Sequence, residues 1–454
     1  MSKTLTFRGI LGPKGLEYDR SIDIAADGTI QAVRAARAPY DGFLAIAGMP
    51  NAHSHVFQHA LAGFGEKARG DDSFWSWREA MYGLAGSITA EEVFAVARHG
   101  YARMLRAGFT HVAEFHYLHH QPDGGRGPEA THAVLAAAAA VGLPISLLPV
   151  YYRTSGFDGA GATAEQRRFA HASVDDFLNT VQALGAAAAG AAPHSLRAVP
   201  PAELADLVTG VDAVLGSESP LHIHISEQER EVEECRAVLD RTPIDLLADT
   251  VALGPRWSLV HATHATAGER SRLRECGARV VLCPLTEAYL GDGIFPAREH
   301  FVAEGAAAVG TDANVRICAV EEARQLEYGQ RLRDRKRARL ATDSGTGAPV
   351  WSWLAKGGGE AVSGSCGSRT GSASIGRIEP GYRADLVVLR KDGPHTAGHG
   401  LETLLDAWLI GGDDRDIQAV YIGGERRVER GSVADEAEIR SDFGKAMREI
   451  RRAI

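Results

Sequence analysis

Short apolar segments of strand length alternate with segments of helical period through the middle of the chain. Eight strands that are each followed by a crossover helix are typical of a (β/α)8 barrel, which needs roughly 250 residues or more. The chain has 454 residues, which leaves room for one barrel with attachments. We therefore expect an α/β fold built on a TIM-like (β/α)8 barrel. The expected strands are 48–55, 109–117, 144–152, 192–199, 221–226, 257–263, 278–284 and 306–312, and the expected helices are 91–107, 128–141, 164–184, 201–215, 228–249 and 266–276.

The two ends of the chain differ from this middle part. Residues 4–45 contain short apolar segments between turn signals such as AADGT and APYDG, and residues 378–435 have the same character in ADLVVL and AVYIGGERRVERG. Both patterns indicate strands joined by tight turns, and we expect the two ends to pack together. The predicted organisation is a composite β-sandwich domain from 1–46 and 378–435, a catalytic barrel domain from 47–377, and a C-terminal helix from 436–454.

Charge and composition exclude several classes of protein. The net charge is −9, whereas a protein that binds nucleic acid or an anionic membrane needs a basic face. The basic run RLRDRKRAR (331–339) is interpreted as the solvated face of the helix after the eighth strand. The N-terminus has no apolar stretch of signal-peptide length, and no apolar run approaches the roughly eighteen residues that span a bilayer. The five cysteines form no C-x-x-C pair and fit a reduced, cytoplasmic setting.

Histidine and aspartate side chains occur at the ends of four expected strands. The carboxyl ends of barrel strands meet at one mouth, so residues from distant parts of the chain converge there. Alternation along a strand sends residues i and i+2 to the same side, so only one histidine of the pair on the fifth strand need be a ligand. Three imidazoles and one carboxylate are ligand types that zinc prefers. The fourth strand, with PHSLR, offers no lysine to bridge two ions, so we expect one metal ion. The candidates are His53 and His55 of the first strand, His222 and His224 of the fifth, His261 of the sixth and Asp312 of the eighth.

Glu227 follows the fifth strand, three residues after His224. A carboxylate beside a metal-activated water can take its proton and pass it to a leaving nitrogen. In this arrangement His261 and Asp312 would hold the water. The alternative is that Glu227 is a helix N-terminal acid, stabilised by the helix macrodipole.

Several motifs together resemble a known enzyme superfamily. HSH on the first strand, histidines on the fifth and sixth, and GTD on the eighth look like the metal motif of the amidohydrolase superfamily. The string IGRIEPGYRADLVVL is similar to the composite β domain of that superfamily. Several longer strings resemble one group of this superfamily, the formimidoylglutamate deiminases of histidine degradation (N-formimino-L-glutamate iminohydrolases). These strings are MPNAHSHVFQHALAG, DSFWSWREAMY, LHIHISEQ, TEAYLGDGIFP, GTDANVRI and LEYGQRLRDRKR.

This resemblance implies a metal-dependent hydrolase that converts N-formimino-L-glutamate to N-formyl-L-glutamate and ammonia. It implies that the protein forms a homodimer. It also implies that the protein binds a small dicarboxylate substrate and binds neither nucleic acid nor a membrane. It implies one zinc ion per subunit, held by His53, His55, His224 and Asp312. It gives catalytic roles to Glu227, His261 and Asp312. Substrate-binding roles fall to Gln58, Arg78, Tyr117, His194 and Arg197.

The sequence departs from the family pattern at two positions. His59 stands where an arginine is expected, outside the inferred site. Tyr289 stands where an asparagine is expected in TEANLGDG, at the rim of the seventh strand. The second change leaves the exact substrate preference open.

Two other functions stay open from the sequence. One is another deaminase of the same superfamily, acting on a heterocyclic amine or a different amidine, and the other is a catalytically silent binding relative. Arg78 and Arg197 favour a dicarboxylate, because guanidinium groups form bidentate pairs with carboxylates. A purine pocket would need aromatic stacking and amide contacts instead. The native metal is open as well, because zinc, iron and manganese all suit this ligand set.

Overall fold

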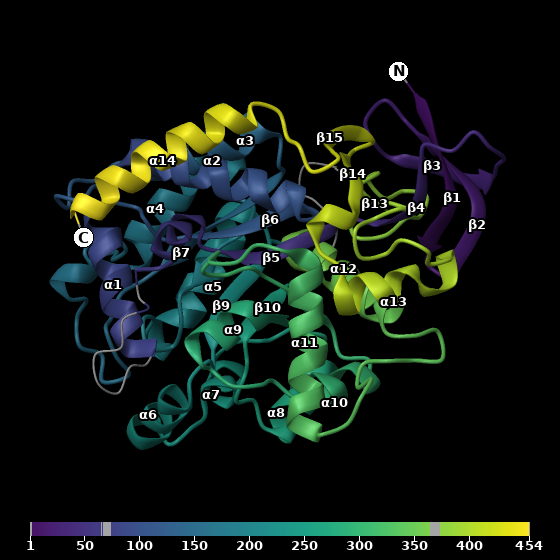
Figure 1. The fold of residues 1–454 in the computed structure, drawn as a ribbon. Coiled ribbons are helices and arrows are strands. Elements are labelled where there is room, and N and C mark those ends of the chain that lie inside the picture. The colour runs from purple at the N-terminus through teal and green to yellow at the C-terminus, as the bar shows by residue number, and fades with distance from the viewer. Residues whose placement is uncertain (1, 65, 67–73, 364–372, 454) are drawn as a thin grey trace.

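A computed structural model gives the fold and describes residues 2–64, 66, 74–363 and 373–453 (Figure 1). It confirms the predicted α/β class, with parallel strands at the centre and helices around them. Within these ranges, no helix is both long and apolar enough to cross a bilayer. Four of the five cysteines lie in the described ranges and carry free thiols, whereas Cys366 lies outside them.

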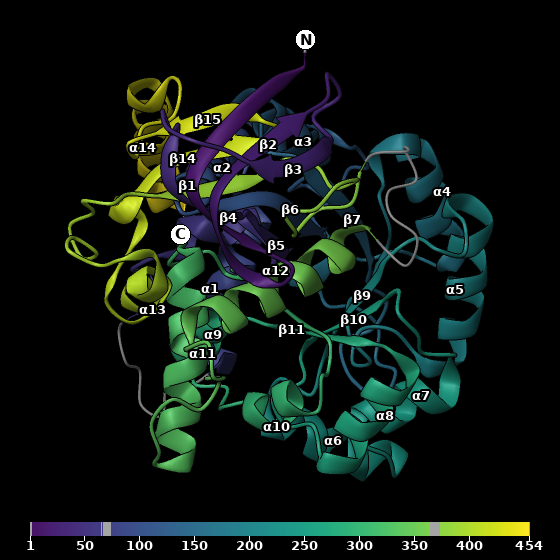
Figure 2. The same cartoon turned by 90° about the vertical axis from the view of Figure 1, so that its right-hand side faces the viewer.

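A seven-stranded sheet brings the two ends of the chain together, as Figures 1 and 2 show in purple and yellow-green. β1 and β2 form an antiparallel hairpin, β4 lies parallel to β1, and β13 pairs antiparallel with β4. The central strand β4 reads GFLAIA and is almost fully buried, as expected of a strand covered on both faces. In sheet order the strands are β15 (Glu425–Glu429), β14 (Ile417–Ile422), β13 (Leu386–Leu389), β4 (Gly42–Ala47), β1 (Lys3–Gly12), β2 (Gly15–Ile24) and β3 (Ile30–Ala35).

Eight parallel strands form two four-stranded sheets, in the orders β5-β6-β7-β8 and β9-β10-β11-β12. Isolated parallel bridges join Ala191 to Leu221 and Ser54 to Asp312, so the last strand of each sheet meets the first strand of the other. Because the strands run in one direction, their carboxyl ends lie on one side of the molecule. The strands are β5 (Met49–Ser54), β6 (Phe109–His116), β7 (Ile145–Tyr151), β8 (Ala192–Pro193), β9 (Leu221–Ile225), β10 (Trp257–His261), β11 (Arg279–Leu282) and β12 (Ala307–Val309).

Helices connect these strands and cover their outer side (Figure 2). Sequence signals mark several of their ends. α2, for example, begins after Thr89, whose hydroxyl accepts from the backbone N–H of Glu92 in a capping box. The helices are α1 (Phe74–Ser87), α2 (Ala90–Arg106), α3 (Glu129–Val141), α4 (Val174–Leu184), α5 (Pro201–Leu215), α6 (Glu229–Leu239), α7 (Pro243–Thr250), α8 (Ala267–Cys276), α9 (Pro284–Leu290), α10 (Ala297–Val302), α11 (Ala319–Asp334), α12 (Gly347–Ser363), α13 (Leu401–Gly411) and α14 (Glu436–Ala453).

Two predicted helices were too long. The predicted helix 164–184 begins as an α-helix only after Ser173, whose side chain caps α4. The predicted helix 228–249 is two helices, because Asp240 takes a left-handed conformation (φ 52°) and Pro243 starts a new helix.

Two further predictions are only partly right. In the predicted strand 192–199, pairing stops after β8, because the carbonyl of Ser195 accepts backbone N–H groups three and four residues on and forms a turn. The basic run 331–339 is helical only to the end of α11, where Arg335 takes φ 54°. In both cases a local turn ends an element that the apolar or charged pattern alone would continue.

The helix α12 covers the amino ends of the parallel strands. A Cβ at Gly357 would lie 1.9 Å from the carbonyl oxygen of Ala307 in β12, and one at Gly358 would lie 2.9 Å from that of Pro50 in β5. The helix therefore approaches the strand backbone at a distance that only glycine permits. With this end covered, the opposite, carboxyl end of the strands is left for a site.

Gly357→Ala is expected to lower the free energy of unfolding by at least about 2 kcal/mol, because the added methyl group forces α12 away from the strands. The matched control is Gly268→Ala in α8, where the residue is exposed and a Cβ would meet nothing within 4 Å. This control is expected to be neutral or slightly stabilising. Chemical denaturation measures both variants, and equal stability of the two would contradict the close approach of α12.

Candidate metal centre and active site

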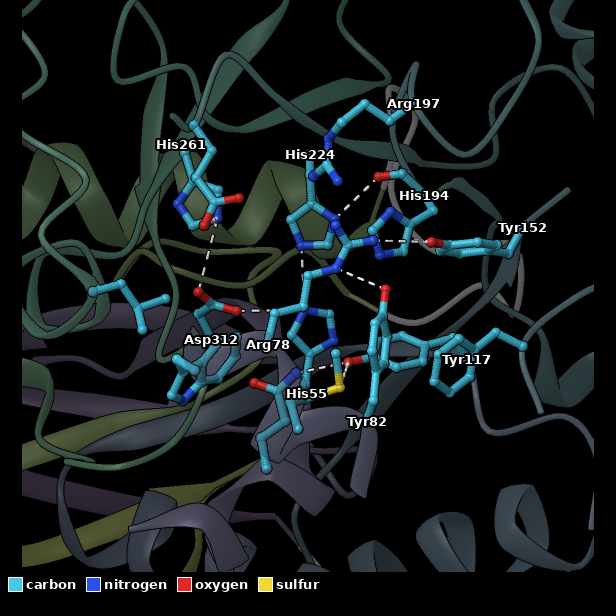
Figure 3. Close-up of a pocket in the computed structure, with 16 residues that line it drawn as sticks. His55, Arg78, Tyr82, Tyr117, Tyr152, His194, Arg197, His224, His261 and Asp312 are labelled. Atoms are coloured by element: carbon cyan, nitrogen blue, oxygen red, sulfur yellow. Dashed lines mark hydrogen bonds and ion pairs between the residues drawn. The ribbon is translucent and has the colours of Figure 1, made fainter. Parts of the chain in front are cut away.

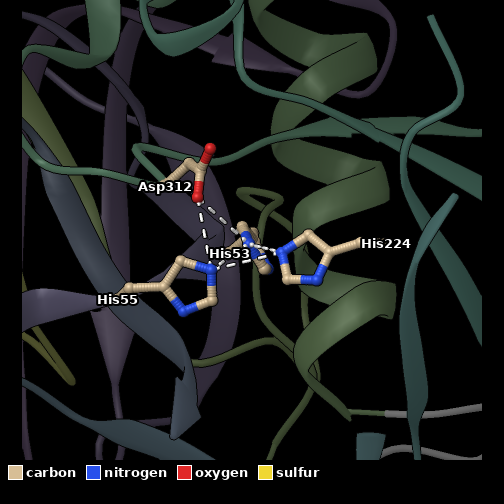
Figure 4. Close-up of side chains that lie close together, drawn as sticks. All are labelled: His53, His55, His224 and Asp312. Carbon is tan, nitrogen blue, oxygen red and sulfur yellow. Dashed lines mark hydrogen bonds and ion pairs between the residues drawn. The ribbon is translucent and has the colours of Figure 1, made fainter. Parts of the chain in front are cut away.

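Three imidazoles and one carboxylate point toward one another at the carboxyl ends of β5, β9 and β12 (Figure 4). The Nε2 atoms of His53, His55 and His224 form a triangle with sides of 3.1, 3.2 and 3.1 Å. Oδ1 of Asp312 lies 3.4 Å from Nε2 of His53 and 3.3 Å from Nε2 of His55. All four side chains are buried. The structure thus brings together the four residues that the sequence predicted as metal ligands.

Backbone contacts fix which ring nitrogens of His55 and His224 carry protons. Nδ1 of His55 donates to the carbonyl of Phe115 (2.9 Å), and Nδ1 of His224 donates to the carbonyl of His194 (3.0 Å). Burial lowers the pKa of His53 to about 3 and also lowers the pKa of His55 and His224, so the rings are neutral. In a neutral ring whose Nδ1 is protonated, Nε2 has a bare lone pair. The bare Nε2 atoms of His55 and His224 lie 3.2 Å apart and repel one another unless a cation lies between them, so this donor set fits a metal ion.

The spacing of the four ligand atoms also suits a single ion. Two ligand atoms that each lie about 2.1 Å from a tetrahedral zinc ion are about 3.4 Å apart, and the separations here are 3.1–3.4 Å. Burial alone would raise the pKa of Asp312, but its hydrogen bond with His53 lowers it, so the carboxylate stays ionised. The group therefore offers three neutral nitrogens and one negative oxygen to a divalent cation.

Close contact between β5 and the segment after β12 places the carboxylate against the histidines. A Cβ at Gly310 would lie 2.7 Å from the Cβ and the carbonyl oxygen of His53, so this approach needs glycine. The side chain of Asn51 accepts from the backbone N–H of Thr311 (3.1 Å) and donates to its hydroxyl (2.6 Å). That hydroxyl in turn donates to the side-chain carbonyl of Asn314 (2.6 Å). These buried hydrogen bonds hold the two segments in register.

A buried acid–base pair lies beside the candidate ligands. Nε2 of His261 lies 3.7 Å from Oε1 of Glu227 and 3.8 Å from Oδ2 of Asp312. Its Nδ1 lies 3.4 Å from Oε1 of Glu287, which also accepts from the backbone N–H of Cys283 (2.9 Å). Burial raises the pKa of Glu227 to about 7. A group with such a pKa can both take and give a proton near neutral pH.

Two residues of the site, and Ser226 directly before Glu227, have a backbone conformation that residues with a side chain rarely adopt. φ is +50° at Ser226, +68° at His261 and +45° at Asp312. Each of the three lies at or just beyond the carboxyl end of a strand. Such conformations cost on the order of 1 kcal/mol or more each and persist only where the surroundings hold them. Their occurrence at three strand ends around one point indicates a functional site.

One pocket adjoins this group, and Figure 3 shows how its residues lie. The acidic side contains Asp312 and Glu227, which are the carboxylates among the described lining residues. His194 lies on the same side of the pocket as Arg78 and Arg197 (Figure 3), and burial and the charges of these arginines lower its pKa. The pocket therefore has acidic and cationic groups in different places. Its lining includes all five residues that the sequence predicted to bind substrate, Gln58, Arg78, Tyr117, His194 and Arg197.

Hydrogen bonds hold two of these side chains in place. Nε2 of Gln58 donates to the hydroxyl of Tyr117 (2.6 Å), and Oε1 of Gln58 is buried with no hydrogen-bond partner among the described residues. Nε of Arg78 donates to the hydroxyl of Tyr82 (2.7 Å), and a terminal nitrogen of Arg78 donates to that of Tyr152 (3.4 Å). The pocket thus offers an acceptor in Gln58 and a fixed cation in Arg78.

The structure also decides between the two histidines of the fifth strand. Nε2 of His222 donates to the carbonyl of Ala361 in α12 (3.0 Å), at the opposite end of the strands. His224 lies at the carboxyl end, within the candidate metal group. His222 therefore has a structural contact and no place in the site.

The two departures from the family pattern lie outside the pocket lining. Nδ1 of His59 donates to the carbonyl of Asn314 (2.7 Å), and its ring stacks on that of His99, with 5.1 Å between the centroids. Tyr289 does not line the pocket, although its neighbour Leu290 does. Tyr289 is therefore not part of the described wall of the pocket.

Residues 44–344, more than half of the chain, match the amidohydrolase family. The chain belongs to the amidohydrolase family. This amidohydrolase is 40% identical to the formimidoylglutamate deiminase of Pseudomonas aeruginosa, over 99% of this chain and 100% of that protein. It is 38% identical to an amidohydrolase crystal structure from Brucella melitensis, with a TM-score of 0.89 and 99% of each chain covered. An adenosine deaminase structure from Xanthomonas campestris with bound zinc has a TM-score of 0.78 at 22% identity, over 99% of this chain and 98% of that chain, and shows the fold alone. The resemblance predicted from the motifs is confirmed.

The amidohydrolase pocket also contains residues that the sequence analysis did not single out, among them Tyr82, Tyr152 and Phe169. Tyr152 directly follows β7, so the rule that strand ends face the mouth could have found it. Tyr82 lies four residues after Arg78 on α1 and shares its helix face. Glu287, which contacts His261, had no such signal, because its position depends on how α9 packs.

Proposed function

We propose that this amidohydrolase is a metal-dependent deiminase that converts N-formimino-L-glutamate to N-formyl-L-glutamate and ammonia in histidine degradation. The identity of 40% to the formimidoylglutamate deiminase of Pseudomonas aeruginosa, over nearly the whole of both chains, supports this reaction. The observation that carries the proposal is the pocket, which is lined by two guanidinium groups, a buried acid–base pair and three of the four candidate ligands.

The charges of the pocket complement those of the substrate. N-formimino-L-glutamate has two carboxylates and one cationic formimino group. Arg78 and Arg197 suit the carboxylates, because a planar guanidinium group donates two parallel N–H bonds to a carboxylate. The buried acceptor Oε1 of Gln58 and the carboxylate of Glu227 suit the N–H groups of the formimino end. A purine has no carboxylate to accept these N–H groups.

Glu227 is the proposed general acid and base of the reaction. A divalent ion held by the four candidate ligands would act as a Lewis acid that activates the attacking water. Glu227 takes a proton from the water as the water oxygen bonds to the formimino carbon, and it gives this proton to the terminal nitrogen. The bond between the carbon and this nitrogen then breaks, ammonia departs, and the oxygen loses its second proton and becomes the formyl carbonyl. His261, 3.7 Å from Glu227 and 3.8 Å from Asp312, is placed between the two carboxylates to hold the water and the oxygen that develops from it.

We also propose that the eight parallel strands form one closed (β/α)8 barrel, a conclusion that the bridges at both pairs of sheet edges support. The seven-stranded sheet would then be the composite β domain, from 1–46 and 378–435, beside a barrel domain from 47–377 and a terminal helix from 436–454. Zinc, one ion per subunit, is the proposed metal. The expected homodimer and the cytoplasmic location stay predictions.

Ammonia release by purified, metal-loaded protein tests the proposed function. We expect kcat/KM for N-formimino-L-glutamate to exceed that for guanine or adenosine by at least about 10⁴-fold, because a heterocycle leaves buried polar groups unpaired. Release from a heterocyclic amine, with none from N-formimino-L-glutamate, would assign the chain to another deaminase. No release from any of these compounds would favour a silent binding relative.

A further inference from the structure

A hydrogen-bonded group of two phenols and one amide lies on the wall of the pocket, and we call Tyr82, Tyr152 and Gln166 the phenol group. Oε1 of Gln166 accepts from the backbone N–H of Thr163 (2.9 Å), which fixes the orientation of the amide. Nε2 of Gln166 then donates to the hydroxyl of Tyr152 (2.8 Å) and to that of Tyr82 (3.0 Å). One amide therefore holds both phenol oxygens.

Arg78 approaches the same two oxygens from the pocket side, as the dashed lines in Figure 3 show. Its Nε donates to Tyr82 and a terminal nitrogen donates to Tyr152, at 2.7 and 3.4 Å. Its guanidinium carbon also lies 5.1 Å from the centroid of the Tyr82 ring. Each phenol oxygen thus accepts N–H groups from both Gln166 and Arg78.

Each phenol still has an O–H proton to donate. The two phenols can share at most one hydrogen bond between them, so at least one proton must find another acceptor. Among the described residues, no acceptor outside the pair lies within hydrogen-bond reach of either hydroxyl. Tyr152 is only 3% exposed and lines the pocket, where an unsatisfied hydroxyl is costly.

The surroundings of Tyr152 favour an anionic acceptor. Burial raises the pKa of the Tyr152 phenol, although the charges of Arg78 and Arg197 oppose the shift, so the hydroxyl keeps its proton. The described carboxylates of the pocket, Glu227 and Asp312, belong to the acidic side beside His261. This part of the wall therefore presents N–H and O–H donors and two positive charges.

We propose that Tyr152 contacts the substrate directly, donating its phenol O–H to the carboxylate that Arg78 binds. Tyr82 and Gln166 hold Tyr152 and Arg78 in the geometry that this contact needs. The pocket then recognises one carboxylate by a guanidinium and a phenol together, and it rejects an amide or a methyl group at that position. The inference rests on the proposed function, because the carboxylate belongs to the proposed substrate.

The experiment removes only the hydroxyl, with Tyr152→Phe. The matched control is Tyr151→Phe, because the neighbouring phenol is also buried but donates to Glu203 (2.5 Å) and does not line the pocket. Kinetics are measured with N-formimino-L-glutamate and with two analogues. N-formimino-4-aminobutyrate lacks the α-carboxylate, and N-formimino-L-norvaline lacks the side-chain carboxylate.

Tyr152→Phe is expected to lower kcat/KM for N-formimino-L-glutamate by about 10- to 100-fold, the loss of one hydrogen bond to a charged group. The loss is expected to disappear for whichever analogue lacks the carboxylate that Arg78 and Tyr152 bind. An equal loss for all three substrates would indicate a merely structural role and would overturn the inference. So would a loss no larger than that of Tyr151→Phe.

Calorimetric titration with glutarate separates this inference from the proposed function. If the wild-type protein releases no ammonia from N-formimino-L-glutamate, the proposed function fails, yet the contact with a carboxylate is still testable. Weaker glutarate binding by Tyr152→Phe than by wild type and Tyr151→Phe would support the contact. Equal binding by all three proteins, or no binding by any, would overturn it.

Discussion

Replacing Glu227 with glutamine is expected to lower kcat for ammonia release by about 10²- to 10⁴-fold, while the protein keeps its metal ion. The amide has nearly the shape of the carboxylate but cannot take a proton from water. Glu227 lies outside the group of four candidate ligands, and its contact at 3.7 Å is with His261. Steady-state kinetics and metal analysis of the same preparation measure the two effects separately.

The control for this variant is Glu229→Gln. Glu229 is exposed at the start of α6, two residues after Glu227, so the same chemical change there is expected to leave kcat unaltered. A Glu227→Gln protein with kcat close to that of wild type would contradict the role of general base. Loss of the metal together with activity would instead make Glu227 a ligand.

Replacing His224 with asparagine is expected to weaken metal binding by at least about 100-fold. Loss of a residue that only hydrogen-bonds to a ligand typically lowers metal affinity about 10- to 100-fold, and loss of the ligand itself should lower it more. Ammonia release falls with the metal content. In wild type, chelation is expected to lower the Tm, since an ion that binds only the folded chain stabilises it. In His224→Asn, the chelator should change the Tm little. Metal analysis after dialysis and thermal unfolding check both expectations.

His222→Asn is the matched control, because it makes the same change two residues away on the same strand. His222 contacts the carbonyl of Ala361 and lies outside the candidate metal group. This variant is expected to lose some stability but to retain one metal ion per chain. Equal metal loss in the two variants would show that the effect comes from disruption of β9 and not from a missing ligand.

These two histidines also show how far the sequence could predict the site. Alternation placed His53 and His55 on one face, and the structure has their Nε2 atoms 3.1 Å apart. The same alternation did not distinguish His222 from His224, because a period of two residues predicts the face of a strand but not which residue on that face reaches the site. Only the packing of α12 against the amino ends of the strands distinguishes them.

Other parts of the fold and the site could not be predicted, because they depend on contacts between distant segments. Gln166 falls in a stretch predicted as helix, but it lies in a short 3-10 turn that reaches Tyr82 of α1. The left-handed conformation of Asp240, which divides a predicted helix, follows no apolar period. The strained backbone at His261 is likewise held by its neighbours rather than encoded locally.

The most direct test of the proposed reaction is the identity of its products. Wild-type, metal-loaded protein is incubated with N-formimino-L-glutamate labelled at the formimino carbon, the labelled carbon product is followed by NMR, and ammonia is assayed in the same samples. We expect N-formyl-L-glutamate and ammonia in equal amounts, because Glu227 protonates the terminal nitrogen of the formimino group. Formation of formamide and L-glutamate would mean that the other carbon–nitrogen bond breaks, and it would contradict the proposed reaction.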